Sequence, residues 1–223
     1  MPDALTRADL ARLIDWGAAL KPDLTERELA AVCDEAVALG VGQLCAQPSL
    51  VEPAVRRLGG RVAVVSVAGF PHGASLPEVK AREAALAVEQ GAAEVDMVIN
   101  RGWLKGGEAS RAEADVAAVV RAAAGRPVKV ILETAALTEA EARLGCRVAE
   151  AAGASFVKTS TGFGYPGATV ASVRLLAEAV GGRLGVKASG GIRTLADTRA
   201  MLAAGATRIG TSAAKAILDE FES

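Results

Sequence analysis

The chain is poor in histidine, cysteine and aromatic residues, and each scarcity excludes a class of site. A single histidine, His72, cannot build a multi-histidine metal site, so no metal is expected, and any histidine relay would have to use that residue. The three cysteines, Cys33, Cys45 and Cys146, are widely separated and form no CxxC, which is typical of reduced intracellular proteins. Aromatic residues make up 3% of the chain, so the core is expected to be built from small and branched aliphatic side chains.

Excess charge and long apolar runs are also missing. The formal net charge is −1, which offers no electrostatic footprint for nucleic acid or for an anionic membrane. No apolar run approaches the roughly 20 residues of a membrane span, and residues 1–3 do not begin a signal peptide. The hydrophobic fraction of 51% excludes a disordered chain, and no linker divides it. We therefore expect one cytoplasmic domain over residues 1–223, with a small-molecule partner.

Short strand-like runs alternate with helix-like segments along the chain. The runs are continuously apolar, which is typical of parallel strands covered on both faces. Strands are expected at 41–46, 62–68, 95–99, 128–132, 156–159, 184–188 and 208–210, with a weaker candidate at 13–20. Helices are expected at 25–39, 76–89, 109–123, 138–151, 169–180, 195–204 and 212–220, with glycine near the C-terminal ends of most of them.

Lysines recur at a fixed interval in three of these runs. Lys129, Lys158 and Lys187 are 29 residues apart, and Asp96 precedes the first of them by 33. One strand–helix unit takes about 30 residues, so the four side chains are expected at similar depths on successive strands. Eight strand candidates predict an α/β fold of the (β/α)8 TIM-barrel type. An open doubly wound sheet is the alternative, although its usual glycine-rich turn after the first strand is missing.

Lys158 and Lys187 are the strongest candidates for chemistry. Each lies inside an apolar run, where an unpaired ammonium is costly and implies a partner or a function. Neighbouring strands of a barrel lie about 4.8 Å apart, so the two amines are expected to repel, and the pKa of one of them to fall. A neutral lysine is a nucleophile that forms Schiff bases with carbonyl compounds. The residues alone do not say which lysine is the nucleophile.

Two carboxylates accompany the lysines. Asp96 is expected to point away from its apolar strand neighbours and either to pair with the lysines or to shuttle protons through a water. Lys129 and Glu133 are four residues apart in one run, which predicts a structural ion pair on one strand face. His72 is expected in a loop at the barrel rim, and Cys45 at the end of a strand, where it can line a pocket. Cys33 and Cys146 are expected to pack on helices.

Glycine and hydroxyl residues follow the last strands. Backbone N–H groups at such turns and at helix N-termini bind phosphate without basic side chains, and TIM barrels commonly hold phosphate in the loops after strands 7 and 8. These loops, with Arg193 nearby, therefore favour a phosphorylated substrate. The candidate residues are Thr159, Ser160, Gly162, Ser189, Gly190, Gly191, Gly210, Thr211 and Ser212.

Five long segments resemble the deoxyribose-phosphate aldolase family: SVAGFPHG at 66–73, EVDMVIN at 94–100, VKVILET at 128–134, FVKTSTGFG at 156–164 and VKASGGIR at 186–193. The resemblance extends from about residue 11 to residue 217. It implies a class I aldolase on a TIM barrel, without metal or cofactor, which reversibly cleaves 2-deoxy-D-ribose 5-phosphate to acetaldehyde and D-glyceraldehyde 3-phosphate. It also implies a homodimer or a larger homo-oligomer.

The resemblance also assigns roles to residues. It implies that Lys158 forms the Schiff base, that Lys187 lowers its pKa, and that Asp96 relays protons with a water. Other positions match the family's phosphate-binding region or its substrate contacts. The phosphate positions are Gly190, Gly191, Gly210 and Ser212, and the positions near substrate are Asp15, Lys21 and Cys45.

Several residues depart from the family's pattern. The first strand lacks the usual His-Thr pair, and the chain ends at 222–223 without the C-terminal tyrosine of many members. We hypothesise that these changes border the active-site mouth and favour a bulkier or more apolar aldehyde or enal. The candidate specificity residues are Trp16, Gln47, Trp103, Ala136, Tyr165 and Pro166.

Two other functions are compatible with these sequence features. One is a different lysine Schiff-base enzyme, such as a transaldolase-like aldolase. The other is a barrel that only binds sugar phosphate. The pair of buried lysines argues against simple binding, because binding alone needs no buried amine.

Overall fold

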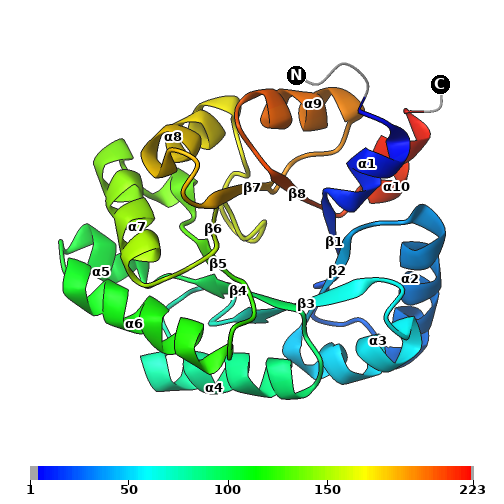
Figure 1. Cartoon of the computed structure of the whole chain (residues 1–223), viewed down its shortest axis with the longest axis horizontal. Coiled ribbons are helices and arrows are strands. Elements are labelled where there is room, and N and C mark those ends of the chain that lie inside the picture. The colour runs from blue at the N-terminus through cyan, green and yellow to red at the C-terminus, as the bar shows by residue number, and fades with distance from the viewer. Residues whose placement is uncertain (1–4, 222–223) are drawn as a thin grey trace.

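Eight parallel strands form a closed barrel in the computed structural model, which describes residues 5–221 (Figure 1). The start and end of the chain considered above lie outside these residues. Each strand pairs with the next, and the last pairs with the first, which confirms the TIM barrel and excludes the open sheet. The strands are β1 (Ile14–Ala19), β2 (Gln43–Ala46), β3 (Ala63–Ala68), β4 (Glu94–Val98), β5 (Val128–Ile131), β6 (Phe156–Lys158), β7 (Gly185–Ser189) and β8 (Arg208–Thr211).

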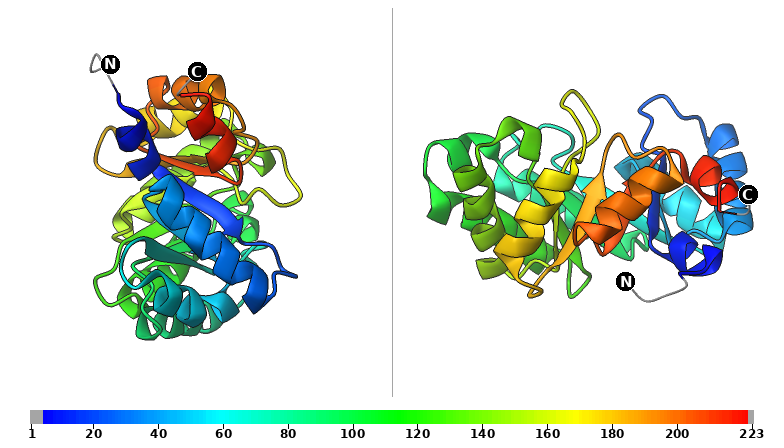
Figure 2. Two further views of the ribbon diagram at one scale, coloured as in Figure 1. Left: turned by 90° about the vertical axis from the view of Figure 1, so that its right-hand side faces the viewer. Right: turned by 90° about the horizontal axis from the view of Figure 1, so that it is seen from above.

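Helices surround the barrel on its outer side (Figures 1 and 2). They are α1 (Arg7–Arg12), α2 (Glu26–Leu39), α3 (Val51–Leu58), α4 (Pro77–Glu89), α5 (Arg101–Lys105), α6 (Ala109–Ala122), α7 (Glu139–Ala151), α8 (Val170–Val180), α9 (Leu195–Ala203) and α10 (Ala214–Asp219). Threonine capping boxes begin several of them, as at Thr25 of α2 and Thr138 of α7. Within residues 5–221 none of the helices is both long and apolar enough to cross a membrane.

The periodicity predicts seven of these helices and misses α1, α3 and α5. Helix α3 carries Pro53 among its first residues, and proline is disfavoured in the interior of a helix. In the first turn of a helix the missing N–H of proline costs nothing, since that position has no partner within the helix. The other two helices are only six and five residues long, too short for a periodic pattern.

The aliphatic core lies mainly between the strands and the surrounding helices. A second, smaller cluster fills the barrel interior beside β2 and β3, and consists of Leu20, Cys45, Val65 and Val67 with Phe70 against them. The rest of the interior carries charged side chains from β1 and from β4 to β8. One side of the barrel interior is therefore apolar, and the other is a network of ion pairs.

The strand register corrects the expected common depth of the four charged residues. Asp96 is aligned with Lys129, and Lys158 with Lys187. Between β5 and β6, however, Lys129 is aligned with Phe156, two residues before Lys158. The strands of a closed barrel are staggered by its shear, so an equal sequence spacing does not give an equal depth. The two aligned pairs lie at different levels, and their side chains still meet.

The predicted ion pair between Lys129 and Glu133 is wrong. Strand β5 ends at Ile131, and Glu133 has a φ of 59°, so the alternation of a strand does not extend to it. Its buried carboxylate accepts hydrogen bonds from the N–H and hydroxyl of Thr161, and lies 3.8 Å from Arg101. Glu133 therefore ties the end of β5 to the loop after β6.

A buried ion pair outside the barrel joins α4 to α6 and to the end of β4. The Lys80 ammonium lies 2.7 Å from Asp115 and donates to the carbonyl of Val98 at 3.0 Å, and both ionic side chains are fully buried. The pair thus fixes the end of the strand that carries Asp96.

We expect Lys80→Met to lower the free energy of unfolding by about 3–5 kcal/mol, because it leaves the Asp115 carboxylate buried without its counter-ion. The double variant Lys80→Met/Asp115→Leu should recover part of that loss. Urea denaturation of both variants checks this, and a single variant as stable as the parent would contradict it.

Candidate active site

A cavity of about 340 Å³ opens inside the barrel at the carboxyl ends of β1, β6, β7 and β8. Lys158 and Lys187 line it, and Asp96 lies directly behind them, with no exposed surface. Of the predicted substrate-binding residues, all but Thr159 and Ser160 line the cavity: Asp15, Lys21, Cys45, Gly162, Ser189, Gly190, Gly191, Gly210, Thr211 and Ser212. The barrel thus brings together residues that are almost 200 positions apart in sequence.

Lys158 has one carboxylate partner. Its Nζ donates to Oδ2 of Asp96 at 2.8 Å, and the side chain is almost completely buried at the end of β6. Burial lowers the pKa of Lys158, and the positive charge of Lys187 lowers it further, while Asp96 acts in the opposite direction. The net direction is downward, which favours the neutral, nucleophilic amine.

Lys187 has two carboxylate partners. Its Nζ lies 2.5 Å from Oδ2 of Asp15 and 2.8 Å from Oδ2 of Asp96. Burial acts to lower the pKa of Lys187, but the two carboxylates outweigh it and hold the pKa well above its ordinary range. Of two neighbouring amines, Lys187 therefore keeps its proton and Lys158 is the one that can lose it. This difference in partners favours Lys158 as the nucleophile, a choice that the residues alone left open.

Asp96 connects three lysines. Oδ1 accepts from Lys129, and Oδ2 is shared by Lys158 and Lys187, all at 2.8 Å. Burial acts to raise the pKa of Asp96, but the three surrounding ammonium groups hold it well below its usual range. The carboxylate is therefore ionised, and it lies against both cavity lysines.

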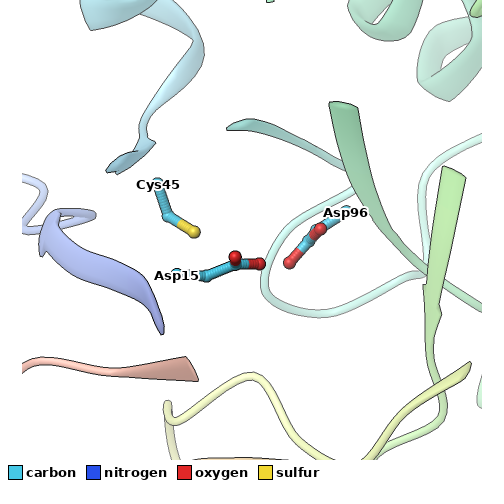
Figure 3. A group of neighbouring side chains, drawn as sticks. All are labelled: Asp15, Cys45 and Asp96. Atoms are coloured by element: carbon cyan, nitrogen blue, oxygen red, sulfur yellow. The ribbon is translucent and has the colours of Figure 1, made fainter. Parts of the chain in front are cut away.

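Asp15, Cys45 and Asp96 form a compact group from β1, β2 and β4 (Figure 3). Their carboxylate oxygens and the thiol sulfur lie within 4.8 Å of one another, a spacing that suits a cation. The Lys187 ammonium contacts all three, with its Nζ 3.7 Å from the sulfur of Cys45. The three groups therefore hold a lysine cation. Burial raises the pKa of the Cys45 thiol, so the thiol stays protonated.

The loops after β6 and β7 approach each other closely at the cavity mouth. Gly190 has a φ of 84°, and its carbonyl accepts from Ala168 at 3.1 Å. A Cβ on Gly167 would come within 2.0 Å of the same carbonyl oxygen, so only glycine fits there. The hydroxyls of Ser189 and Thr211 donate to backbone carbonyls of neighbouring loops. The two loops are thereby held as one preformed rim, and the loop after β6, yellow in the right-hand view of Figure 2, projects beyond the barrel.

Two predicted substrate residues lie outside the cavity lining. Thr159 is fully buried, and its hydroxyl exchanges hydrogen bonds with the backbone of Ser189. Ser160 is also buried, and its carbonyl accepts from the Ser189 hydroxyl. Both residues link the loop after β6 to the end of β7 and so support the rim from behind.

The six candidate specificity residues do not line the cavity either. Trp16 points outward from β1 into the core, with its indole N–H donating to Ser212, and Gln47 donates to the carbonyl of Leu20. Trp103 packs under Arg111 on the outer layer, and Tyr165 is half-exposed beside Arg101. Ala136 and Pro166 lie in the loops after β5 and β6. None of the six residues therefore contacts the cavity directly, as a reshaped pocket would require.

Sequence reasoning missed several residues that do line the cavity. Phe163 is among them, and its ring meets that of Phe70 edge-on, with centroids 5.2 Å apart. Leu20 and Ile192 supply further apolar surface, and Arg193, noted above only as a possible helper for phosphate, is a further cation of the lining. Loop side chains carry no periodicity, so no signal in the sequence gives their direction. His72 is exposed in its loop, as expected, and Cys33 and Cys146 are buried on α2 and α7.

Comparisons with known proteins identify the relatives of this chain. The family model of the DeoC/LacD family aldolases matches residues 10–220. The deoxyribose-phosphate aldolase of Mycolicibacterium paratuberculosis is 54% identical over 220 residues, which cover 96% of this chain and 97% of that one. The deoxyribose-phosphate aldolase of Nocardia farcinica is 53% identical over 221 residues, which cover 98% of this chain and 97% of that one. Among solved structures, the tetrameric deoxyribose phosphate aldolase of Aeropyrum pernix is 35% identical, with a TM-score of 0.89. The match covers 98% of this chain and 93% of that one.

The closed parallel barrel and the match to an aldolase family model define the chain as a barrel aldolase, an enzyme of the lyase class. The chain belongs to the DeoC/LacD family of aldolases.

Proposed function

We propose that this enzyme is a class I aldolase that reversibly cleaves 2-deoxy-D-ribose 5-phosphate to acetaldehyde and D-glyceraldehyde 3-phosphate. The observation that carries the proposal is the unequal pairing of the two lysines. Among the carboxylates of residues 5–221, Asp96 alone pairs with Lys158, whereas Asp15 and Asp96 both pair with Lys187. A neutral amine next to a fixed ammonium is what Schiff-base chemistry needs. The names of the relatives supply the substrate.

The reaction begins when the Lys158 amine attacks the aldehyde carbon, C1, of the open-chain sugar. Loss of water gives the protonated imine, whose positive charge the adjacent Asp96 carboxylate stabilises. The C3 hydroxyl then gives up its proton, and the C2–C3 bond breaks. The electron pair of the broken bond stays with C2 and forms the enamine. The released piece is glyceraldehyde 3-phosphate. Protonation at C2 and addition of water then release acetaldehyde and restore the amine.

Asp96 is assigned to these proton transfers, and Lys187 is assigned to keeping the Lys158 amine neutral. Asp96 relays protons between the substrate and a water, because it is the carboxylate that touches both cavity lysines. Lys187 keeps its charge throughout, which disfavours a second positive charge on Lys158. The phosphate lies at the glycine-rich rim formed by Gly190, Gly191 and Gly210, with Arg193 beside it.

Reductive trapping tests the proposal. The enzyme is incubated with acetaldehyde, reduced with borohydride and digested, and the modified peptide is identified by mass spectrometry. We expect the adduct on Lys158. An adduct on Lys187 would reverse the two roles, and the absence of any adduct would favour a barrel that only binds sugar phosphate.

The phosphate assignment predicts a preference for the phosphorylated sugar. We expect kcat/KM for 2-deoxyribose 5-phosphate to exceed that for 2-deoxyribose by roughly 10- to 100-fold, the value of one or two charge-assisted hydrogen bonds. An enal or aromatic aldehyde serves as the third substrate in the same assay. Faster turnover of that aldehyde would contradict this prediction and support the reshaped pocket.

Two further expectations belong to this proposal. We propose a homo-oligomer, and a tetrameric relative of known structure supports it; light scattering of the purified enzyme tests it. We also propose a cytoplasmic location, supported by the three cysteines, which are free and buried in the structure.

A further inference from the structure

The charges inside the barrel extend below the two cavity lysines, to the amino ends of β4 and β8. Arg208, the first residue of β8, lies 2.8 Å from Oδ1 of Asp15 and 3.7 Å from Glu94. Glu94, the first residue of β4, also pairs with Lys129. Neither Arg208 nor Glu94 lines the cavity. They reach Lys158 only through other members of the network.

The ring of Phe156 supports this lower layer. It lies 5.4 Å from the Arg208 guanidinium and 5.9 Å from the Lys129 ammonium. A Cβ at position 185 would come within 2.2 Å of the ring, so the glycine that begins β7 makes room for it. A cation next to an aromatic face is held in place, and the two basic side chains are therefore positioned by packing as well as by their carboxylates.

The number of charges in this network is informative. Three carboxylates face four basic groups, and the thiol of Cys45 is the remaining titratable group of the network; β3 adds only the apolar Val65 and Val67. The full set is Asp15 from β1, Cys45 from β2, Glu94 and Asp96 from β4, Lys129 from β5, Lys158 from β6, Lys187 from β7 and Arg208 from β8. Lys21 and Arg193 lie farther out, at the cavity mouth.

The network is balanced only when one of the four basic groups is neutral. A guanidinium does not lose its proton in proteins. Lys129 contacts three carboxylates and Lys187 contacts two, whereas Lys158 contacts one. The proton is therefore lost most easily from Lys158.

We propose that Arg208 and Glu94 are positioning residues that set the protonation of Lys158 by completing the charge balance of the barrel interior. This proposal rests on the role of Lys158 as the nucleophile proposed above. Loss of the Arg208 charge leaves an excess of negative charge, which favours the ammonium form of Lys158. Loss of the Glu94 charge has the opposite effect, because it leaves an excess of positive charge.

The two neutral variants therefore predict pH shifts of opposite sign. In Arg208→Gln, the midpoint of the pH dependence of imine formation should move up by roughly one unit, as for a unit charge on the order of 10 Å away at an effective dielectric near 20. In Glu94→Gln it should move down by a similar amount. Arg208→Lys keeps the charge and should restore the parent midpoint. Arg183→Gln, which removes an exposed arginine paired with Glu150, is the matched control and should leave the midpoint unchanged.

The measurement is the initial rate of the borohydride-trapped acetaldehyde adduct on Lys158 as a function of pH, with thermal melts to show that each variant is folded. A purely structural role would lower the rate without moving the midpoint, or would move it in the same direction in both variants, and either result overturns the proposal. If Arg208→Gln does not fold, Glu94→Gln alone decides, since an unchanged or raised midpoint contradicts the charge balance. If the parent enzyme forms no adduct on Lys158, it is the proposed function that fails.

Discussion

Replacing Lys158 with leucine is expected to abolish turnover and leave the barrel folded. Removing a covalent nucleophile typically costs roughly 10⁴-fold or more in kcat, and the neighbouring Lys187 cannot substitute because its two carboxylates keep it protonated. The loss should appear in both steady-state cleavage of 2-deoxyribose 5-phosphate and borohydride trapping.

The fold is expected to survive because the leucine replaces an amine that the neighbouring carboxylate does not need as its counter-ion. Asp96 keeps Lys129 and Lys187 as partners, so no carboxylate is left unpaired. The cost of breaking a buried ion pair comes from the charge left without a partner, and none is left here, so the melting temperature should stay close to that of the parent. Lys215→Leu, which removes an exposed lysine paired with Asp219, is the control and should retain full activity. Residual turnover within about tenfold of the parent would contradict the assignment of Lys158.

The sequence was sufficient for the barrel because each strand–helix unit carries its own local signals. Continuous apolar runs, threonine caps and glycines near the helix ends act within a few residues, so they can be identified without the rest of the chain. The recurrence of Lys129, Lys158 and Lys187 also follows from the unit length. The depth of each lysine inside the barrel does not follow from the unit length. The two-residue step between β5 and β6 is a property of the closed barrel and of no single unit.

The parts of the site that were missed depend on long-range packing or on loop direction. Arg208 begins a strand, where a cation is ordinarily solvated, and nothing near it in sequence shows that it meets Asp15, which is 193 positions away. Glu133 leaves the strand pattern through a backbone conformation that its neighbours do not signal. Trp16 is different, because alternation along β1 places it opposite Asp15 and therefore outside the barrel. That placement was available from the sequence, and it argues against a pocket role for Trp16.

Asp96→Asn is expected to be the most damaging single change in the network. The carboxylate is the contact shared by all three lysines, and a neutral amide removes the one negative charge that lies between Lys158 and Lys187. Breaking a buried ion pair by removing one partner typically costs about 3–5 kcal/mol in the free energy of unfolding. Loss of the proton relay should lower kcat by roughly 10²- to 10⁴-fold, the range for general acid–base catalysis.

The pH dependence of stability separates this effect from simple misfolding. The pKa of Asp96 in the folded protein lies well below its ordinary value, so the carboxylate contributes stability that is fully present above the pKa of the unfolded chain. That contribution is lost as the pH falls through the folded-state pKa. The stability difference between parent and Asp96→Asn should therefore be largest near neutral pH and shrink below about pH 4. Urea denaturation at several pH values measures it, with Asp34→Asn, which removes an exposed carboxylate paired with Arg57, as the control. A difference that stayed constant down to pH 3 would show that Asp96 stabilises the barrel through its shape and hydrogen bonds, and that its charge contributes nothing.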